Sequence, residues 1–340
     1  MHDNIRLPGI DDIRDAALRI AAYAVRTPVI ESPFLNDCVG ARILLKAEIL
    51  QRTGSFKFRG AYNRIAQIDP ADHPGGVVAC SSGNHAQGAA EAARLCKLPA
   101  VIVMPRDAPA IKVARTRRSG AEIVFYDRYT EDRDAIAQDL SARRNAAYVA
   151  PFDDPGVISG QGTVGLELAA QAKAIGAELE AVLVPCSGGG LTAGIAVAME
   201  EAMPKARVYT VEPQGFDDYL RSLQSGSRER NAPDSASICD ALLVAQPGAL
   251  TFAMNRERLG GGLAVSDAEV RTAVAFAYNE LKLIVEPGGA VALAAVLSGR
   301  YPISGKAVGI VLSGGNMDPS MLGEILGQES GMRAPAMLER

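Results

Sequence analysis

Lys57 stands in a setting that favours nucleophilic chemistry. It lies between Phe56 and Phe58, in the first turn of a segment that we predict to be helical. Burial between aromatic rings and the positive end of the helix dipole both favour the neutral amine over the ammonium ion. A neutral lysine amine is the nucleophile required for a Schiff base. A solvent-facing lysine on an amphipathic helix is the alternative, so the role of Lys57 depends on the groups around it.

A run of small residues could hold a phosphate group. Residues 187–190, Ser-Gly-Gly-Gly, follow an apolar segment at 181–185 and precede a predicted helix. Glycines let backbone amides converge on a ligand, and the start of a helix favours an anion. The run also fits a loose dinucleotide fingerprint, with Glu212 about 20 residues further on. A nicotinamide-dependent oxidoreductase therefore stays open beside an enzyme with another phosphate-bearing cofactor.

Polar side chains follow two other predicted strands. Ser81, Ser82, Asn84 and His85 come after the strand at 76–80 and open the next helix. Hydroxyl, amide and imidazole groups at a helix start suit a carboxylate, whereas ordinary helix capping needs only one such residue. Near the C-terminus, Ser313 follows another apolar strand. Parallel α/β folds hold their ligands at this end of the strands.

Short apolar runs alternate with helical segments along the chain, which indicates an α/β fold. Such spacing is typical of a mostly parallel, twisted sheet with helices on both faces. A capping box, Ser266 with Glu269, opens one of the helices. We predict strands at 43–46, 76–80, 101–104, 122–126, 181–185, 207–211 and 307–312. We predict helices at 56–68, 84–96, 110–119, 133–143, 158–174, 191–203, 267–281 and 289–297.

Composition excludes several classes of protein. The 340 residues are 48% hydrophobic and 22% charged, enough for a sizeable core, and a net charge of −4 carries no basic field for nucleic acid or an anionic membrane. The apolar runs are shorter than the about 20 residues that span a bilayer. The N-terminus has no signal-peptide pattern, and the five cysteines form no CxxC motif. We therefore expect a cytoplasmic protein.

Five motifs in sequence order resemble the fold type II pyridoxal-phosphate enzymes, and within them the serine/threonine dehydratase branch, with threonine dehydratases, serine racemases and 3-hydroxyaspartate dehydratases. They are TGSFKFRGA, SSGNHAQG, PCSGGGL, EPGGAVALAA and LSGGNMD, within a match from about Thr27 to Pro319. The resemblance implies a large cofactor-binding domain, residues 1–79 and 147–340, and an inserted smaller α/β domain, residues 80–146. Ser187 stands where the family loop often has a glycine.

The resemblance also implies a role for each matching position. Lys57 would hold pyridoxal 5′-phosphate as an aldimine, and Ser82 would be the acid/base on the opposite face. The implied cofactor-binding residues are Phe56, Lys57, Asn84, Ser187, Gly188, Gly189, Gly190, Leu191 and Ser313. The implied substrate-binding residues are Ser81, Ser82, Asn84, His85 and Arg133. Glu212, the backbone carbonyl of Phe216, and Asp218 match a divalent-cation site for Mg²⁺, Ca²⁺ or Mn²⁺.

We therefore expect a pyridoxal-phosphate-dependent dehydratase, a carbon–oxygen lyase of the hydroxy-amino-acid ammonia-lyase type. It would eliminate water from a β-hydroxy amino acid such as L-threonine or L-serine, giving a 2-oxo acid and ammonia. Lys57 would be the general base, and Ser313, meeting an unprotonated pyridine nitrogen, would favour elimination over transamination. We expect a homodimer that acts on a small amino acid, without a nucleic-acid or membrane partner.

Three further functions stay open beside this one. A 3-hydroxyaspartate dehydratase needs a second cation for the second carboxylate, and Arg128 or Arg133 could supply it. Serine racemase-type activity needs a proton donor on the far face of the substrate, for which Ser82 is suited. A non-catalytic pyridoxal-phosphate-binding protein would keep the phosphate loop, although the presence of both Lys57 and Ser82 argues against it.

Overall fold

The computed structural model describes residues 6–329, except Ser82, Pro109, Arg128, Tyr129, Ser304 and Lys306. Its helices are α1 (Ile10–Ile20), α2 (Pro33–Val39), α3 (Lys57–Ile65), α4 (Asn84–Leu95), α5 (Ala110–Arg118), α6 (Arg133–Arg144), α7 (Pro155–Ala174), α8 (Gly190–Ala202), α9 (Asp218–Ser225), α10 (Ala249–Asn255), α11 (Asp267–Asn279), α12 (Pro287–Leu297) and α13 (Pro319–Glu329). Its strands are β1 (Val29–Ile30), β2 (Arg42–Ala47), β3 (Val77–Cys80), β4 (Ala100–Pro105), β5 (Glu122–Tyr126), β6 (Ala147–Val149), β7 (Leu179–Pro185), β8 (Arg207–Pro213), β9 (Gly261–Val265) and β10 (Ala307–Leu312).

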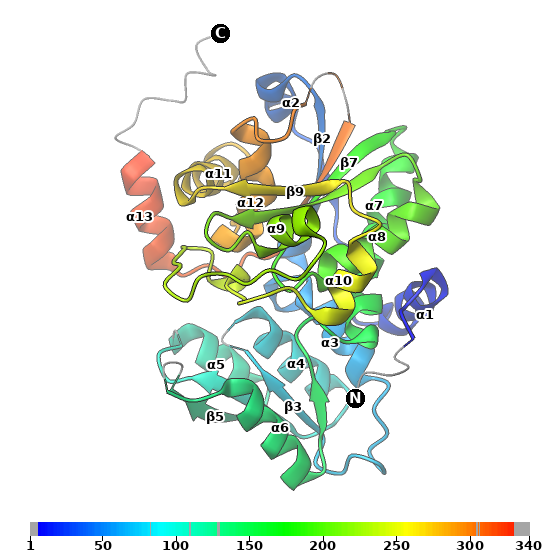
Figure 1. The fold of residues 1–340 in the computed structure, drawn as a ribbon, viewed down its shortest axis with the longest axis vertical. Helices are drawn as coiled ribbons and strands as arrows, with labels where there is room; N and C mark the ends of the chain where they lie inside the picture. The colour runs from blue at the N-terminus through cyan, green and yellow to red at the C-terminus, as the bar shows by residue number, and fades with distance from the viewer. Residues whose placement is uncertain are drawn as a thin grey trace.

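A six-stranded sheet forms the upper part of the molecule in Figure 1. Its strand order is β1-β2-β10-β7-β8-β9, and every pair is parallel except β1 with β2. The central strands are continuous apolar runs, as in β10, because parallel strands are buried on both faces. The predicted α/β fold with a mostly parallel sheet is confirmed.

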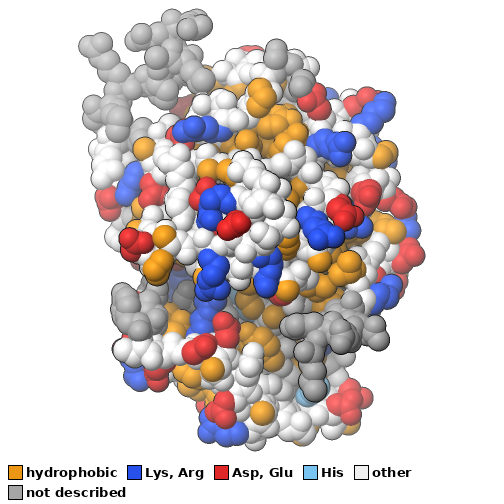
Figure 2. All heavy atoms as spheres, in the orientation of Figure 1, with side chains coloured by type: hydrophobic (Ala, Val, Ile, Leu, Met, Phe, Trp, Pro, Cys, Tyr) orange, Lys and Arg blue, Asp and Glu red, His pale blue; other side chains and the backbone are white. Residues whose placement is uncertain are grey.

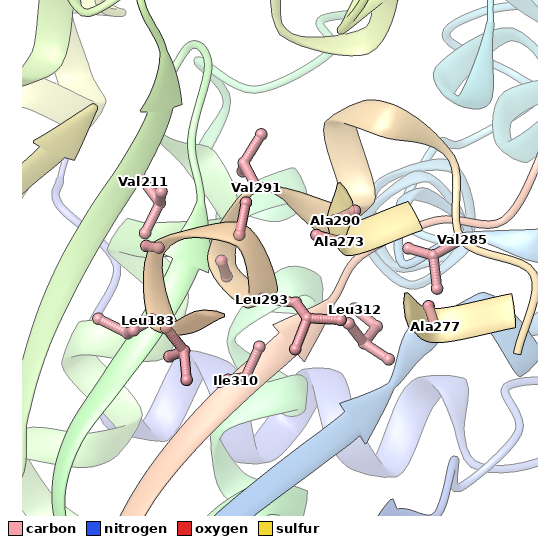
Figure 3. Close-up of a cluster of buried hydrophobic side chains, with 14 of the residues drawn as sticks. Leu183, Val211, Ala273, Ala277, Val285, Ala290, Val291, Leu293, Ile310 and Leu312 are labelled. Carbon is pink, nitrogen blue, oxygen red and sulfur yellow. The ribbon is translucent and has the colours of Figure 1, made fainter. Parts of the chain in front are cut away.

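Helices cover both faces of this large sheet. On one face α11 and α12 pack against β7, β8 and β10, where Leu183, Val211, Leu293 and Ile310 meet (Figure 3). On the other face α7 and α8 pack against the same strands through a second apolar cluster. The fully apolar sequence of α12 follows from its position, because nearly every one of its residues is buried.

A four-stranded parallel sheet, ordered β5-β4-β3-β6, lies in the lower part of Figure 1. Helices α3 and α4 pack on one of its faces, and α6 packs on the other. Its strands come from residues 77–149, a few residues beyond the expected 80–146 segment at each end. Helix α3 precedes that segment in the chain, yet its apolar side chains belong to the core of the small sheet.

Most predicted elements are confirmed within a few residues, including the capping box of Ser266 and Glu269. The predictions did not include α1, α2, α9, α10, α13, β1, β6 and β9. Helix α1 carried a usable signal, since Ile13, Ala16 and Ile20 recur at helical spacing and are buried. Strand β9 carried none, because it begins with two glycines and lies at the edge of the sheet.

No helix among the described residues is long and apolar enough to cross a membrane. Basic and acidic side chains are interspersed on the face shown in Figure 2.

Candidate active site

A single pocket collects the predicted cofactor-binding and substrate-binding residues that the structure describes. It opens where β3, β7 and β10 end, and α3, α4 and α8 begin. The predicted residues in its lining are Phe56, Lys57, Ser81, Asn84, His85, Arg133, Ser187, Gly188, Gly189, Gly190, Leu191 and Ser313. Ser82 and Arg128, also named by the sequence, lie outside the described residues. Segments separated by more than 200 residues thus meet at one point.

Lys57 is the first residue of α3, and its side chain reaches into this pocket. Its Nζ donates a hydrogen bond to the carbonyl of Pro151 at 2.7 Å and lies 5.2 Å from the centroid of the Phe56 ring. Burial lowers the pKa of Lys57 from 10.5 to about 8. The neutral fraction of the amine near pH 7 therefore rises by about two orders of magnitude. The amine is thus prepared for the predicted nucleophilic role.

The 187–190 loop has the properties of an anion cradle. Helix α8 begins at Gly190, and no side chain in the described part of the chain caps its first turn, so these amides have no side-chain partner there. The hydroxyl of Ser187 is buried, with no hydrogen-bond partner among the described residues. Buried polar groups are normally paired, so this hydroxyl and the amides call for a ligand. A phosphate group satisfies both.

The loop has to be glycine because aromatic rings pack behind it. A Cβ on Gly188 would lie 2.4 Å from the ring of Phe152, and one on Gly189, at φ +90°, would lie 2.2 Å from the hydroxyl of Tyr219. Helix α10 holds the loop from the same side, because Thr251 Oγ1 donates to the carbonyl of Gly188 at 2.5 Å. Sequence analysis missed these supports, since no motif marks them and α10 has only seven residues.

The start of α4 provides a second anion site. Its N-cap, Gly83, has no side chain to cap the helix, and no side chain among the described residues accepts a hydrogen bond from the amides of its first turn. Ser81 Oγ accepts from the Gly83 amide at 3.1 Å and lines the pocket beside it. The free amides of the first turn are donors for a carboxylate.

His85 is neutral and keeps one free nitrogen. Its Nε2 lies 3.0 Å from the carbonyl of Val149 and must donate to it, so Nδ1 is an acceptor, buried and without a partner among the described residues. Burial, with the charge of Lys57 as a smaller cause, lowers the pKa of His85 to about 3. His85 therefore faces the pocket with an acceptor, whereas the predicted carboxylate contact needs a donor.

Asn84 is held by hydrogen bonds on both sides. Its Nδ2 donates to Glu286 Oε1 at 2.5 Å, and its Oδ1 accepts from Asn316 at 2.8 Å. Burial, and then the charge of Asp240, raises the pKa of Glu286 to about 7. Ser313 lies across the pocket, and its backbone carbonyl accepts from the amide of Phe56 at 3.1 Å. These contacts fix the predicted ring-binding side chains before any cofactor arrives.

Two cations line the pocket beyond Lys57. Arg133 begins α6, and the nearest charge to its guanidinium is Asp134 at a long 3.6 Å. Lys112 of α5, which sequence analysis did not single out, donates to Asp240 Oδ2 at 2.5 Å. Lys112 is thus neutralised within the protein, whereas Arg133 makes no hydrogen bond among the described residues.

The predicted cation-binding residues lie outside the pocket, where β8 ends and α9 begins. Burial and the charge of Asp218 raise the pKa of Glu212 well above its usual range, and burial raises that of Asp218 to about 6. Asp218 Oδ2 is buried without a partner among the described residues. No group of three or more His, Cys, Asp and Glu side chains in the described part of the chain could hold a metal. A cation here would thus need the two carboxylates and a backbone carbonyl, and the unpartnered oxygen fits one.

Glu212 also decides against the nicotinamide alternative. Its carboxylate is fully buried and accepts from the amides of Tyr219 at 2.9 Å and Leu220 at 2.8 Å. A ribose-binding carboxylate must instead be open to the cofactor at the end of its strand. Residues 187–190 therefore resemble a dinucleotide loop in sequence only.

Comparison with known proteins agrees with this site. A family model for pyridoxal-phosphate-dependent enzymes matches residues 20–314. An L-threo-3-hydroxyaspartate ammonia-lyase from a Pseudomonas species is 43% identical over 314 residues, 92% of this chain and 97% of that protein. The crystal structure of a T.th. threonine deaminase superposes with a TM-score of 0.85 at 43% identity, and the match covers 92% of this chain and 99% of that one. The structure of maize serine racemase superposes with a TM-score of 0.88 at 38% identity, and the match covers 96% of this chain and 98% of that one.

This chain belongs to the family of pyridoxal-phosphate-dependent enzymes. The predictions of fold type II, of pyridoxal phosphate as cofactor and of a dehydratase of the ammonia-lyase type are confirmed. Because ammonia is the product that defines these relatives, the activity is grouped with carbon–nitrogen lyases, although the β-elimination itself breaks a carbon–oxygen bond.

Proposed function

We propose that this chain removes water from L-threo-3-hydroxyaspartate, releasing ammonia and leaving a 2-oxo dicarboxylic acid. The observation that carries the proposal is Arg133, a pocket-lining residue whose one salt bridge among the described residues is long, 3.6 Å to Asp134. A guanidinium can bind a carboxylate through two N–H donors. Sequence identity alone does not choose the substrate, because a threonine deaminase reaches the same 43% as the hydroxyaspartate enzyme.

Pyridoxal phosphate fits the donors and acceptors that line the pocket. The Ser187 hydroxyl and the uncapped amides of α8 would hold its phosphate, Asn84 its ring hydroxyl, and Ser313 its ring nitrogen. Lys57 would hold it covalently. When bound, the cofactor supplies a conjugated system that takes up the negative charge developing at the substrate Cα.

The remaining steps belong to side chains of this chain. The uncapped start of α4, with Ser81, would hold the α-carboxylate and so orient the Cα–H bond. Lys57 Nζ, displaced from the cofactor by the substrate amine and neutral through burial, would take that proton and pass it to the departing β-hydroxyl, which leaves as water. Arg133 would hold the second carboxylate, whose burial without a cation would be costly. Ser82, outside the described residues, stays the proposed acid/base of the opposite face.

L-Threonine is the second candidate, and a separate observation favours it. Leu242, Leu243 and Val244 line the same pocket after Asp240. An apolar wall of this kind suits the methyl group of threonine better than a carboxylate. The two candidates therefore differ in whether Arg133 or this wall faces the substrate side chain.

Ammonia release from the pyridoxal-phosphate-loaded enzyme tests the choice. The panel comprises L-threo-3-hydroxyaspartate, L-threonine, L-serine and D-serine. Arg133→Gln should lower kcat/KM for the dicarboxylate about 100-fold and that for threonine less than about threefold, because only one substrate loses a charged contact. Arg143→Gln is the control, on the same helix but paired with Asp139 at the surface. Equal losses for both substrates in Arg133→Gln would reject hydroxyaspartate as the substrate.

We also propose that a divalent cation, with Mg²⁺ first, binds Glu212, the Phe216 carbonyl and Asp218. The support is the buried oxygen of Asp218, unpartnered among the described residues, beside a second carboxyl group. Isothermal titration with Mg²⁺, Ca²⁺ and Mn²⁺ tests this site. Asp218→Asn should abolish the binding.

The homodimer, the cytoplasmic location and a small closing domain of residues 80–146 remain proposals. Contacts such as Lys112 with Asp240, and Arg115 with Asn316 at 2.8 Å, support closure because they join the small-sheet unit to the large-sheet unit across the pocket. Sedimentation of the loaded enzyme measures the oligomeric state, with one species of twice the chain mass expected.

A further inference from the structure

A buried ion network lies directly behind the helix that carries Lys57. Arg59, two residues further along α3, has no exposed surface. Its guanidinium forks onto Glu48 through Nε and Nη2, both at 2.8 Å. A second fork joins it to Glu167 of α7 through Nη1 at 2.8 Å and Nη2 at 2.9 Å. Paired forks fix the guanidinium in position and in orientation.

The network is balanced in charge and saturated in hydrogen bonds. Lys46 of β2 donates to Glu167 Oε2 at 2.6 Å and to the carbonyl of Thr27 at 2.7 Å. Lys46 and Arg59 thus face Glu48 and Glu167, two charges of each sign. Thr27 also donates to Glu48 Oε1 at 2.5 Å. A buried network in which every group is satisfied is rigid, because any shift would leave a charge unpaired.

The opposite side of α3 is attached to the other sheet. Phe58, Ala61 and Ile65 are fully buried in the apolar core of the small sheet, together with α4. Apolar contacts of this kind have no fixed direction and tolerate small displacements. Helix α3 therefore stands between the two units. Its ion network faces the large sheet, which carries the phosphate cradle at the end of β7.

We propose that Arg59 is a positioning residue for Lys57: the ion network of Lys46, Glu48, Arg59 and Glu167 ties the first turn of α3 to the large sheet and so sets the distance between the Lys57 amine and the 187–190 cradle. None of the four lines the pocket. Their influence on the cofactor therefore passes through the α3 backbone. The inference rests on the proposed role of Lys57 as the residue that holds pyridoxal phosphate.

The physical reason is the sensitivity of covalent chemistry to geometry. A displacement of about 1 Å at reacting atoms can lower reaction rates about 100-fold. The cradle fixes the phosphate end of the cofactor, and Lys57 must meet its other end. A loosened α3 would weaken this double attachment without removing a single contact to the cofactor.

Two conservative variants test the proposal. Glu48→Gln keeps the shape of the side chain but removes its charge, and Arg59→Lys keeps the charge but removes the fork. Both should weaken the binding of pyridoxal phosphate about tenfold or more and shift the pH midpoint of its visible absorbance, since the amine is displaced. Arg59→Met should lose more of its affinity for pyridoxal phosphate than Arg59→Lys. If Arg59→Met yields no folded protein, the two conservative variants decide alone.

Two further variants separate positioning from stability. Val274→Ala loosens the apolar core beside α11, on the other face of the large sheet, and Ile65→Val loosens the apolar face of α3. Both should lower the unfolding temperature of the apoprotein, yet change cofactor affinity less than about threefold. Affinity losses that follow the unfolding temperature in all four variants, or no loss in any, would overturn the proposal. A wild type without cofactor on Lys57 would instead reject the proposed function.

Discussion

The two most polar buried regions of this molecule differ in whether their groups are paired. In the ion network around Arg59, both cations and both carboxylates are matched at 2.6–2.9 Å. In the pocket beside it, the Ser187 hydroxyl and His85 Nδ1 have no partner among the described residues, and two helix starts are uncapped. The two regions are separated by a single turn of α3.

This difference locates function. Burying a polar group without a partner costs about 1–3 kcal/mol, so a cluster of unpaired groups calls for a reason other than folding stability. In the pocket that reason is the cofactor and the substrate. The network, although more highly charged, needs no ligand. Charge density alone would point to the network, whereas four buried groups without a partner among the described residues, on His85, Gln161, Ser187 and Thr192, gather in the lining of the pocket.

Removing the amine of Lys57 from the pocket should have the largest effect on activity. Lys57→Met should lower ammonia release about 1000-fold or more and abolish covalent attachment of the cofactor. The apoprotein should be at least as stable as wild type at pH 7. The pKa of about 8, lowered from 10.5, means that the unfolded chain binds more protons between these values. Wild-type stability should therefore rise from pH 8 to 10.5, and the variant should lose that rise. Retained turnover in Lys57→Met would contradict the mechanism.

Removing a charge from the ion network should instead lower the stability of the apoprotein. Glu48→Ala leaves two buried cations, Lys46 and Arg59, facing the single carboxylate of Glu167, and should lower the free energy of unfolding by about 3–5 kcal/mol. Glu31→Ala is the control, because its partner Arg42 is part-exposed and the pair is worth about 1 kcal/mol or less. Urea unfolding of the apoproteins measures both. Similar losses in the two variants would show that the network is not stabilising.

A smaller effect is expected from the Ser187 hydroxyl in the 187–190 loop. Ser187→Ala removes a hydroxyl that has no partner in the described part of the chain, so the stability of the apoprotein should hardly change. The affinity for pyridoxal phosphate should fall about 10- to 100-fold, since a hydrogen bond to a charged group is worth about 1.5–3 kcal/mol. Ser298→Ala, whose hydroxyl donates only to its own helix, should leave affinity unchanged. Unaltered affinity in Ser187→Ala would remove this residue from the cradle.

The smallest predicted effect concerns the carboxyl pair near α9. In the metal-free protein the pKa of Asp218 is about 6, above its usual 3.8, so the folded state holds the proton more tightly than the unfolded chain. Stability should therefore fall as pH rises from about 4 to 6, by about 1–3 kcal/mol, relative to Asp218→Asn. Mg²⁺ should reverse this loss at pH 7. A wild type that responds to neither pH nor Mg²⁺ would contradict a cation site.

Sequence predicted most of the side chains that meet in the pocket but little of what supports them. Ser187 and Ser313 directly precede glycines, and Lys57 lies three residues from Gly54 and from Gly60, so each stands in a short motif. The contact of Thr251 with Gly188 joins residues 63 apart, and that of Arg59 with Glu167 joins residues 108 apart. Pairing over such distances depends on the tertiary fold, so no local pattern announces it.

The same limit applies to the fold. Strands such as β7 and β10 were predictable because burial on both faces requires an unbroken apolar run. The packing of α3 in the core of the small sheet was not predictable from sequence. Which residues of α3 face each sheet depends on the residues that they contact in the folded protein.

The most direct test of the account is chemical labelling of the loaded enzyme. Borohydride reduction fixes pyridoxal phosphate to the amine that holds it, and peptide mapping by mass spectrometry identifies that residue. We expect one label per chain, on the peptide that contains Lys57. A label on Lys112 or Lys46, or none on any lysine, would contradict the claim that the unpaired groups beside α3 mark the active site.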